Sequence, residues 1–191
     1  MSEDKDLQEE LAALLGGGQG AVLDGTAPRV APASLKGRLL ASLKSTRRFA
    51  HFEDRVAAML QIPVERAQVV LRAFDDPGVW VRELPMAEFF WVERGSALKD
   101  AVCGFVRVDR GTTFPEHEHL GRERVLMIQG AMVDVVTGER FGPGDVSERE
   151  AGSSHAYVAE DGGVDMVHLV VADVGYRFGD VIAGPREPAA Y

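Results

Sequence analysis

Residues 111–130, GTTFPEHEHLGRERVLMIQG, and residues 144–155, GDVSEREAGSSH, decide the fold of this chain. Their histidines, carboxylates and glycines follow the spacing Gly111-x5-His117-x-His119-x3-Glu123-x6-Gly130 and Gly144-x5-Glu150-x-Gly152-x2-His155. Histidines two positions apart on a strand point to the same face, because side chains alternate along a strand. We therefore expect His117 and His119 to face one site, which Glu123 joins after a corner and His155 joins from a distant strand.

This set of donors predicts a metal centre inside a β-barrel. Neutral imidazole nitrogens and a carboxylate oxygen together suit a borderline divalent cation. We expect one divalent metal ion, with zinc as the first choice and iron, nickel or manganese as further possibilities. The alternative is that His117 and His119 are surface residues of a strand beside an unrelated His155, which would make the whole spacing accidental.

The rest of the chain divides into four parts by its patterning. We expect an acidic N-terminal segment with a Gly-rich linker over residues 1–30, a helical region over 31–78, a β-barrel over 79–178 and a loose tail over 179–191. Many short strands separated by Gly, Asp and Pro are typical of an antiparallel sandwich or barrel. The predicted fold is therefore mainly β, preceded by a small α-helical region.

Apolar stripes at helical spacing mark the helical region. They consist of Leu35, Leu39, Leu40 and Leu43, then Phe52, Val56, Met59 and Leu60, and finally Ala67, Val70, Leu71 and Phe74. Pro63 is expected as the first residue of the last of these helices. The expected strands are Val79–Val81, Phe89–Val92, Val102–Val108, Val125–Gln129, Met132–Val135, His155–Val158 and Met166–Val171.

Strand parity predicts part of the pocket around the metal. If Glu123 and His155 point inward, then Val125, Met127 and Tyr157 should line the pocket as well. Tyr157 either hydrogen-bonds a molecule on the metal or is a half-buried barrel tyrosine, and both alternatives stay open. For His168 a core or edge position is favoured over a role in the pocket.

Composition indicates the environment and the partners of the chain. The net charge of −9 argues against nucleic-acid binding, although residues 36–72 carry 8 Lys and Arg against 3 Asp and Glu. The sequence has one cysteine, Cys103, and no apolar run long enough to span a membrane, so we expect a cytoplasmic protein without membrane attachment. The bulky run Phe89-Phe90-Trp91 should be covered on both faces, by helices, by a second sheet or by another subunit, which suggests a homodimer.

The two quoted stretches resemble the two motifs of the cupin family. The first motif, G-x5-H-x-H-x3-E-x6-G, is present without a gap, and the second, G-x5-P-x-G-x2-H-x3-N, is matched at both glycines and at His155. Glu150 stands where the family has proline and Ala159 where it has asparagine, and neither position is a metal ligand in the family. The resemblance implies a double-stranded β-helix, or jelly-roll barrel, with the four residues named above as metal ligands.

The flanking sequence is similar to the ChrR type of cupin domain, which forms the C-terminal part of zinc-dependent anti-sigma factors. The similarity lies in GFVRVDRGTTFPEHEHLGRERVLMIQG (104–130) and FGPGDVSEREAGSSHAYVAEDGG (141–163), and APASLKGRLLASL (31–43) resembles the helix that joins the two domains there. In that family the N-terminal domain binds a sigma factor and coordinates zinc through an H-x3-C-x2-C element and a further histidine. This element has no counterpart here, because no histidine precedes His51 and the only cysteine is Cys103.

The resemblance implies a metal-binding cupin with a ChrR-like regulatory or sensory function that responds to a small molecule or an oxidant. A sigma factor-like protein would bind through the helical region, and a small-molecule ligand would occupy the barrel. The alternative is a metal-dependent small-molecule enzyme such as a cupin dioxygenase, because four protein ligands leave coordination positions open. A third possibility is that the metal only stabilises the barrel, so that chelation would lower the melting temperature and change nothing else.

Overall fold

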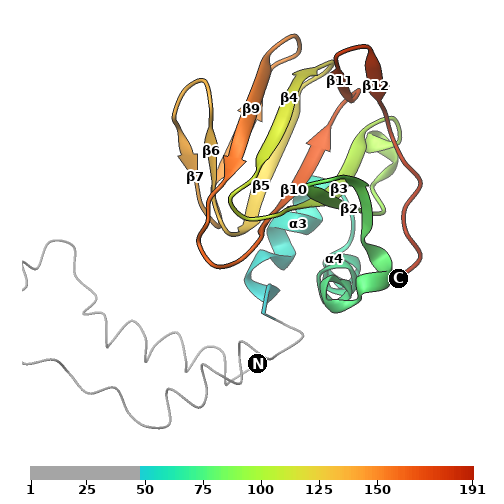
Figure 1. Cartoon of the computed structure of the whole chain (residues 1–191). Helices are drawn as coiled ribbons and strands as arrows, with labels where there is room; N and C mark the ends of the chain where they lie inside the picture. Colours follow the sequence, from blue (N-terminus) through green and yellow to red (C-terminus); the bar gives the residue numbers. More distant parts are fainter. Residues whose placement is uncertain (1–47) are drawn as a thin grey trace, which may run out of the picture. The chain divides into compact units, whose positions relative to one another are not determined.

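A computed structural model describes residues 48–191 of the chain, which lie within one compact unit spanning residues 46–191 (Figure 1). Two six-stranded antiparallel sheets form the body of this unit. In spatial order, sheet A contains β1 (Val81–Leu84), β2 (Ala87–Trp91), β3 (Val102–Val108), β10 (Met166–Ala172), β5 (Glu123–Gln129) and β8 (Val146–Arg149). Sheet B contains β12 (Val181–Ala183), β11 (Tyr176–Phe178), β4 (Thr113–His119), β9 (Ser154–Ala159), β6 (Met132–Asp134) and β7 (Arg140–Phe141). This is the mainly β cupin fold that the sequence predicted.

Strand β10 shows why sheet A is buried on both faces. All seven of its residues are buried, and alternate side chains enter two different cores. Val167, Leu169 and Val171 belong to a helix-side core, while Met166 and Val170 belong to a barrel core between the two sheets. A strand covered on both faces reads as a continuous apolar run, which is the pattern of residues 166–172.

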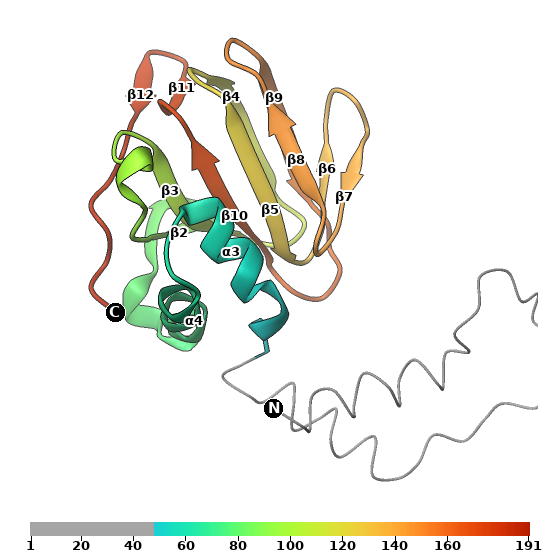
Figure 2. The ribbon, with the colours of Figure 1, turned by 180° about the vertical axis from the view of Figure 1, so that it is seen from behind.

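The helices cover the outer face of sheet A (Figure 2). They are α3 (Glu53–Leu60) and α4 (Val64–Arg72), accompanied by the 3₁₀ turns Ala50–Phe52, Ala73–Asp75, Pro77–Val79 and Ser96–Leu98. The expected apolar stripes are confirmed from Phe52 onward, with Met59 only partly buried, whereas Leu35, Leu39, Leu40 and Leu43 lie outside the described residues. Pro63 immediately precedes α4 as its N-cap. No helix of residues 48–191 has the length and apolar character needed to cross a membrane.

The expected boundary at residue 78 does not separate two compact units. Residues of α3 and α4 share the helix-side core with Phe90 and Phe105 of sheet A. Phe74, which follows α4, packs edge-on against Phe105 with ring centroids 4.5 Å apart. The helices are thus part of the same folded body as the barrel, because neither could bury its apolar face alone.

The expected loose tail is also corrected by the structure. Within residues 179–191, Val181–Ala183 forms β12 at the edge of sheet B. The segment then returns across the molecule, where the amide of Ala189 donates to the carbonyl of Trp91 and the Tyr191 hydroxyl accepts from the amide of Glu93. Strand β12 is short and exposed, so it lacks the alternation of apolar and polar residues from which a strand is predicted.

The four motif glycines all lie at turns with positive φ. They are Gly111 (71°), Gly130 (68°), Gly144 (92°) and Gly152 (80°). At Gly130, a Cβ atom would in addition lie only 2.9 Å from the Cα of Met166. These positions require glycine because the backbone has positive φ there, a conformation that other residues rarely adopt.

Candidate metal centre

A β-bulge in β4 brings the rings of Phe114, His117 and His119 to the same, inner face of sheet B. Phe114 pairs with Tyr157 and His117 pairs with His155, so the register shifts between Phe114 and His117. Without the shift, side chains three positions apart would face opposite ways; the bulge at Pro115 and Glu116 absorbs the extra residue. Proline suits this place because it lacks the N–H that a regular ladder requires.

His117, His119 and His155 converge inside the barrel, as their spacing predicted. Each offers one ring nitrogen, and these nitrogens lie within 4.8 Å of one another. All three side chains are buried, and the ring of His117 lies 4.8 Å from that of His155 and 5.0 Å from that of His119, centroid to centroid. Three imidazoles this close, from two neighbouring strands, are a suitable nitrogen donor set for a divalent cation.

Glu123 approaches the histidines from the other sheet, at the start of β5. Its Oε2 lies 3.3 Å from Nε2 of His119, and its Oε1 accepts a hydrogen bond of 2.7 Å from the hydroxyl of Tyr176. Burial alone would raise the pKa of Glu123, but His119, the Tyr176 hydroxyl and His117 outweigh it and lower the pKa to about 2. The carboxylate is therefore charged at neutral pH, in the state that binds a metal.

The Nδ1 atom of each of the three histidines contacts a polar atom that is not part of the metal centre. Nδ1 of His117 lies 2.9 Å from the carbonyl oxygen of Pro115, and that of His119 lies 3.0 Å from Oγ of Ser153. Nδ1 of His155 lies 2.9 Å from Oδ2 of Asp134. Such partners fix the ring orientation and leave Nε2 as the free donor, which is the usual arrangement around a protein-bound metal.

One buried atom indicates that the site is made for a cation. Nε2 of His119 is fully enclosed and has no hydrogen-bond partner among the described residues, and Oε2 of Glu123 lies 3.3 Å from it. Burial lowers the pKa of His117 to about 4 and also lowers that of His155, so both rings are neutral at pH 7. A buried nitrogen lone pair without a partner is costly, and a divalent metal would satisfy it. The residues present therefore fit the predicted metal.

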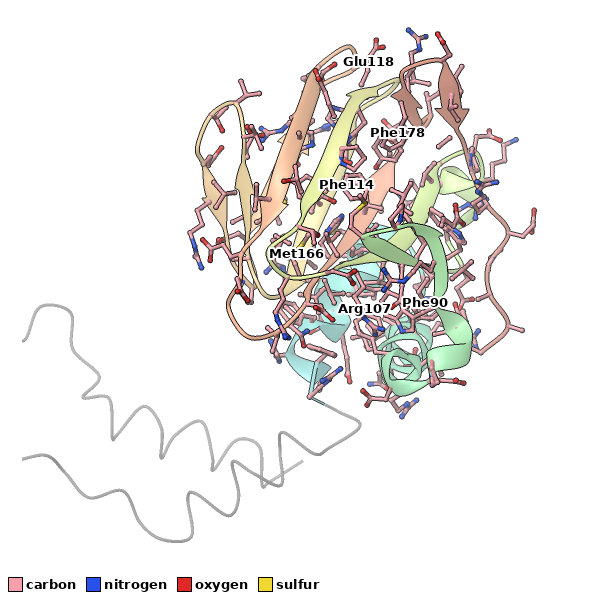
Figure 3. All side chains as sticks on the ribbon, in the orientation of Figure 1. Phe90, Arg107, Phe114, Glu118, Met166 and Phe178 are labelled. Carbon is pink, nitrogen blue, oxygen red and sulfur yellow. The ribbon has the colours of Figure 1, made fainter. Side chains whose placement is uncertain are left out.

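The centre borders a partly open cavity of about 550 Å³ between the sheets. Of the residues predicted to line the pocket, Val125 and Tyr157 do so. Met127 is completely buried in the barrel core, opposite His168 in the ladder, and is not among the lining residues. In Figure 3, Phe178, Phe114 and Met166 follow one another along the barrel, away from the end marked by Glu118.

The C-terminal segment contributes part of the cavity wall. Phe178, Val181, Ala183 and Gly184 line it, and so does Arg186, whose guanidinium lies 3.4 Å from the carboxylate of Glu83. Glu83 also accepts a hydrogen bond of 2.9 Å from the indole N–H of Trp91. Residues expected to form a loose tail thus help to enclose the cavity.

Two residues of the centre escaped the sequence analysis. Tyr176, opposite His119 in the ladder, lies on the short strand β11, and Asp134 closes β6. Asp134 also receives the backbone amides of Val136 and Thr137 and the guanidinium of Arg149. The spacing Asp134-x2-Thr137-Gly138 is a turn signal that could have identified Asp134, whereas nothing in the sequence marked Tyr176 as the partner of Glu123.

Replacing Tyr176 with phenylalanine should weaken zinc binding about 10- to 100-fold, the usual effect of losing an outer partner of a metal ligand. The variant removes only the hydroxyl that donates to Glu123. Titration of zinc against a competing chelator would measure the change. Tyr191→Phe is the matched control, since it removes a hydroxyl near Glu93, remote from the centre. Equal affinity in Tyr176→Phe and wild type would show that Glu123 does not need this support.

His168 lines the same cavity and is buried, with a pKa lowered to about 4 by burial. The unfolded chain then binds this proton more readily than the folded protein at pH values between 4 and the ordinary value of 6.5. The free energy of unfolding should therefore fall by about 2 kcal/mol between pH 7 and pH 5 on account of this residue. Urea unfolding of the metal-free protein would measure it, with His168→Gln expected to lose correspondingly less. An identical loss in both proteins would contradict the assignment.

Cys103 lies on the opposite face of sheet A from the cavity, in the helix-side core. Burial raises the pKa of its thiol to about 11. A protonated, enclosed thiol is a poor nucleophile and a poor metal ligand. These observations agree with the expectation that Cys103 packs as a small apolar residue.

Comparison with known proteins relates this architecture to one family. The profile of the ChrR cupin-like domain matches residues 69–172, which is 104 of the 191 residues. The anti-sigma-E factor ChrR of Cereibacter sphaeroides is 32% identical over 89 residues, which cover 47% of this chain and 40% of that protein. The chain therefore matches well under half of this curated relative's length.

A solved structure shares the fold. It is the crystal structure of Rhodobacter sphaeroides SigE in complex with the anti-sigma ChrR, with a TM-score of 0.50 and 22% identity, and the similarity covers 90% of this chain and 81% of that chain. At this identity the likeness concerns the fold alone. Together with the profile match over more than half of the sequence, the evidence shows that the chain belongs to the ChrR cupin-like domain family.

Proposed function

We propose that this protein is a metal-dependent regulatory cupin, which binds a small molecule in its barrel and transmits that binding to a protein partner. The observation that carries the proposal is the position of the buried histidine cluster beside a mainly apolar cavity, which His117 and His155 line. His117, His119, Glu123 and His155 would hold the metal, and zinc is our first choice. When bound, the cation supplies a Lewis-acidic position for an oxygen or nitrogen atom of the ligand.

A sigma factor-like protein is the partner that we propose. Support comes from family membership and from the SigE complex of a relative with the same fold. The helical region would provide the contact. In its described part, the faces of α3 and α4 away from the core carry the exposed residues Arg55, Arg66 and Arg72. We further propose that the protein acts in the cytoplasm as a homodimer, which light scattering of the purified chain would test.

Co-purification tests the regulatory proposal. The tagged chain would be co-expressed with each sigma factor of the host, with His119→Ala as a metal-site variant in parallel. We expect one sigma factor to be retained by the wild type and its retention to change in the variant. If no sigma factor is enriched at any expression ratio, the partner proposal fails.

An enzyme, such as a cupin dioxygenase, is the second candidate. The observation that favours it is the neutral imidazole of His168 at the cavity wall, because a base near a metal can move protons of a bound substrate. Oxygen uptake by the iron-loaded protein, with diketones and thiols as substrates, tests this candidate. Turnover above that of a His119→Ala control would move the function from binding to catalysis.

A further inference from the structure

Two polar side chains face the cavity without any role in the metal centre. Tyr157 comes from β9 in sheet B and His168 from β10 in sheet A, and both line the cavity with only 4% of their surface exposed. Their ring centroids lie 5.9 Å apart and their planes are nearly perpendicular, at 83°. The two sheets thus bring a phenol and an imidazole together across the barrel.

The imidazole of His168 presents an acceptor to the cavity. Its Nδ1 lies 3.3 Å from the sulfur of Met166, a contact in which the nitrogen donates its hydrogen to the thioether. The tautomer with hydrogen on Nδ1 leaves a lone pair on Nε2. No hydrogen bond reaches Nε2 from any residue in the range 48–191.

The phenol of Tyr157 presents a donor. A phenolic hydroxyl carries its hydrogen at neutral pH and can donate it. Its ring is stacked on Phe114, with centroids 4.9 Å apart and planes within 2° of parallel, which fixes the direction of the hydroxyl. Like Nε2 of His168, this hydroxyl has no hydrogen-bond partner in the described part of the chain.

Apolar side chains form much of the wall around this pair, while the metal-centre ring of His155 lies 5.7 Å from the ring of Tyr157, centroid to centroid. The cavity wall near the pair includes Val106, Val125 and Val170 together with the aromatic side chains of Phe89, Trp91 and Phe178. Because the donor of Tyr157 and the acceptor of His168 both face the cavity without a partner among residues 48–191, the cavity favours a molecule that pairs with both. A hydroxyl group does so, since it donates one hydrogen and accepts at its lone pairs.

We propose that the cavity recognises a phenol, that is, a hydroxyl group on a flat apolar body. Its O–H donates to Nε2 of His168, its oxygen accepts from the hydroxyl of Tyr157, and its ring lies among the aromatic residues of the wall. A volume of about 550 Å³ is suitable for such a molecule. The inference rests on the proposed function in one respect, namely that the barrel binds a small molecule.

Tryptophan fluorescence of the zinc-loaded full chain tests the inference. Trp91 lines the cavity, whereas Trp80, the second of the two tryptophans, lies in the helix-side core. The probes are 4-butylphenol and its methyl ether, 4-butylanisole, which has the same body but no hydrogen to donate. We expect the phenol to bind roughly 10-fold more tightly than the ether, the effect of the one buried hydrogen bond to Nε2 of His168 that the ether cannot make.

The variants decide whether His168 causes this preference. His168→Leu should bind the two probes about equally, while His168→Gln, which restores a polar group near the position of Nε2, should recover part of the preference. Tyr157→Phe should weaken the binding of both probes, because both oxygens accept from its hydroxyl, and His168→Gln keeps the test of the preference intact if His168→Leu does not fold. A preference that persists in His168→Leu would assign phenol recognition to the metal and overturn the inference, as would equal binding of the probes, or binding of neither, in the wild type.

Metal analysis of the same samples separates this inference from the proposed function. Wild-type protein that holds zinc but shows no preference for the phenol would remove the inference and leave the metal site standing. If protein that takes up no metal still prefers the phenol, the recognition role of His168 and Tyr157 is supported and the proposed metal-dependent function is contradicted.

Discussion

Replacing His119 with alanine is expected to weaken zinc binding by more than 100-fold, since loss of even an outer partner costs about 10- to 100-fold. His119 is completely enclosed, and its Nε2 is the buried nitrogen without a partner at the heart of the histidine cluster. The substitution removes one of the converging donors and deprives Glu123 of its nearest imidazole. The barrel should remain folded, because its cores are apolar and independent of this ring.

A chelator competition titration, with circular dichroism to confirm folding, measures the effect. His51→Ala is the matched control, because His51 is an exposed histidine beside α3 and far in sequence from the motifs. It should bind zinc as the wild type does. Full stoichiometric zinc in His119→Ala would show that the assigned ligand set is wrong.

Replacing Phe90 with alanine is expected to lower the free energy of unfolding by about 3 to 5 kcal/mol, the usual cost of truncating a buried phenylalanine. Phe90 has no exposed surface and touches rings from the segments that cover sheet A: Trp80 at 5.6 Å, Phe74 at 6.1 Å and the C-terminal Tyr191 at 5.2 Å, centroid to centroid. Its loss would leave a cavity between the sheet and everything packed on its outer face.

Urea unfolding of Phe90→Ala beside Phe89→Ala isolates the role of this face. The two residues are identical and adjacent, but Phe89 is half-buried and lies at the cavity, where it stacks on Trp91. We expect Phe89→Ala to cost less than half as much. A larger loss in Phe89→Ala would mean that the helix-side core is not the principal support of sheet A.

The convergence of the three histidines could be predicted because it depends on two simple periodicities. The alternation of side chains places His117 and His119 on one face, and the motif glycines mark the turns that return the chain to this face. Val125 and Tyr157, which the same reasoning expects in the pocket, are among the residues that line the cavity. It also foresaw that the run at Phe90 would be covered on both faces, and the structure provides that cover within one chain.

Other features depend on contacts between distant segments, which alternation cannot reveal. The bulge at Pro115 is a local exception to the period of two, and it decides that Phe114 shares the inner face with the histidines. Met127 has the right parity and lies beside His168 on the neighbouring strand, but it is not among the residues that line the cavity. For His168 a core or edge position was favoured; it is buried, and it also lines the cavity.

Residues after position 172 contribute to the metal centre and to the cavity. Tyr176, Phe178 and Arg186 follow the residues matched by the family profile, which ends at residue 172, but they support Glu123 or line the cavity. Strand β11 has only three residues, so its sequence did not reveal that Tyr176 pairs with β4. The shape of the ligand cavity in this protein therefore depends on a segment outside the shared domain.

The most direct test of the central claim is the metal content of natively expressed protein, purified without chelator or nickel resin. The arrangement of His117, His119, Glu123 and His155 predicts about one equivalent of a divalent metal per chain, with zinc as the first choice. Iron, manganese or nickel at the same stoichiometry would keep the site and favour an enzyme. Folded protein that contains no metal, and takes none up on dialysis against zinc, would contradict the account.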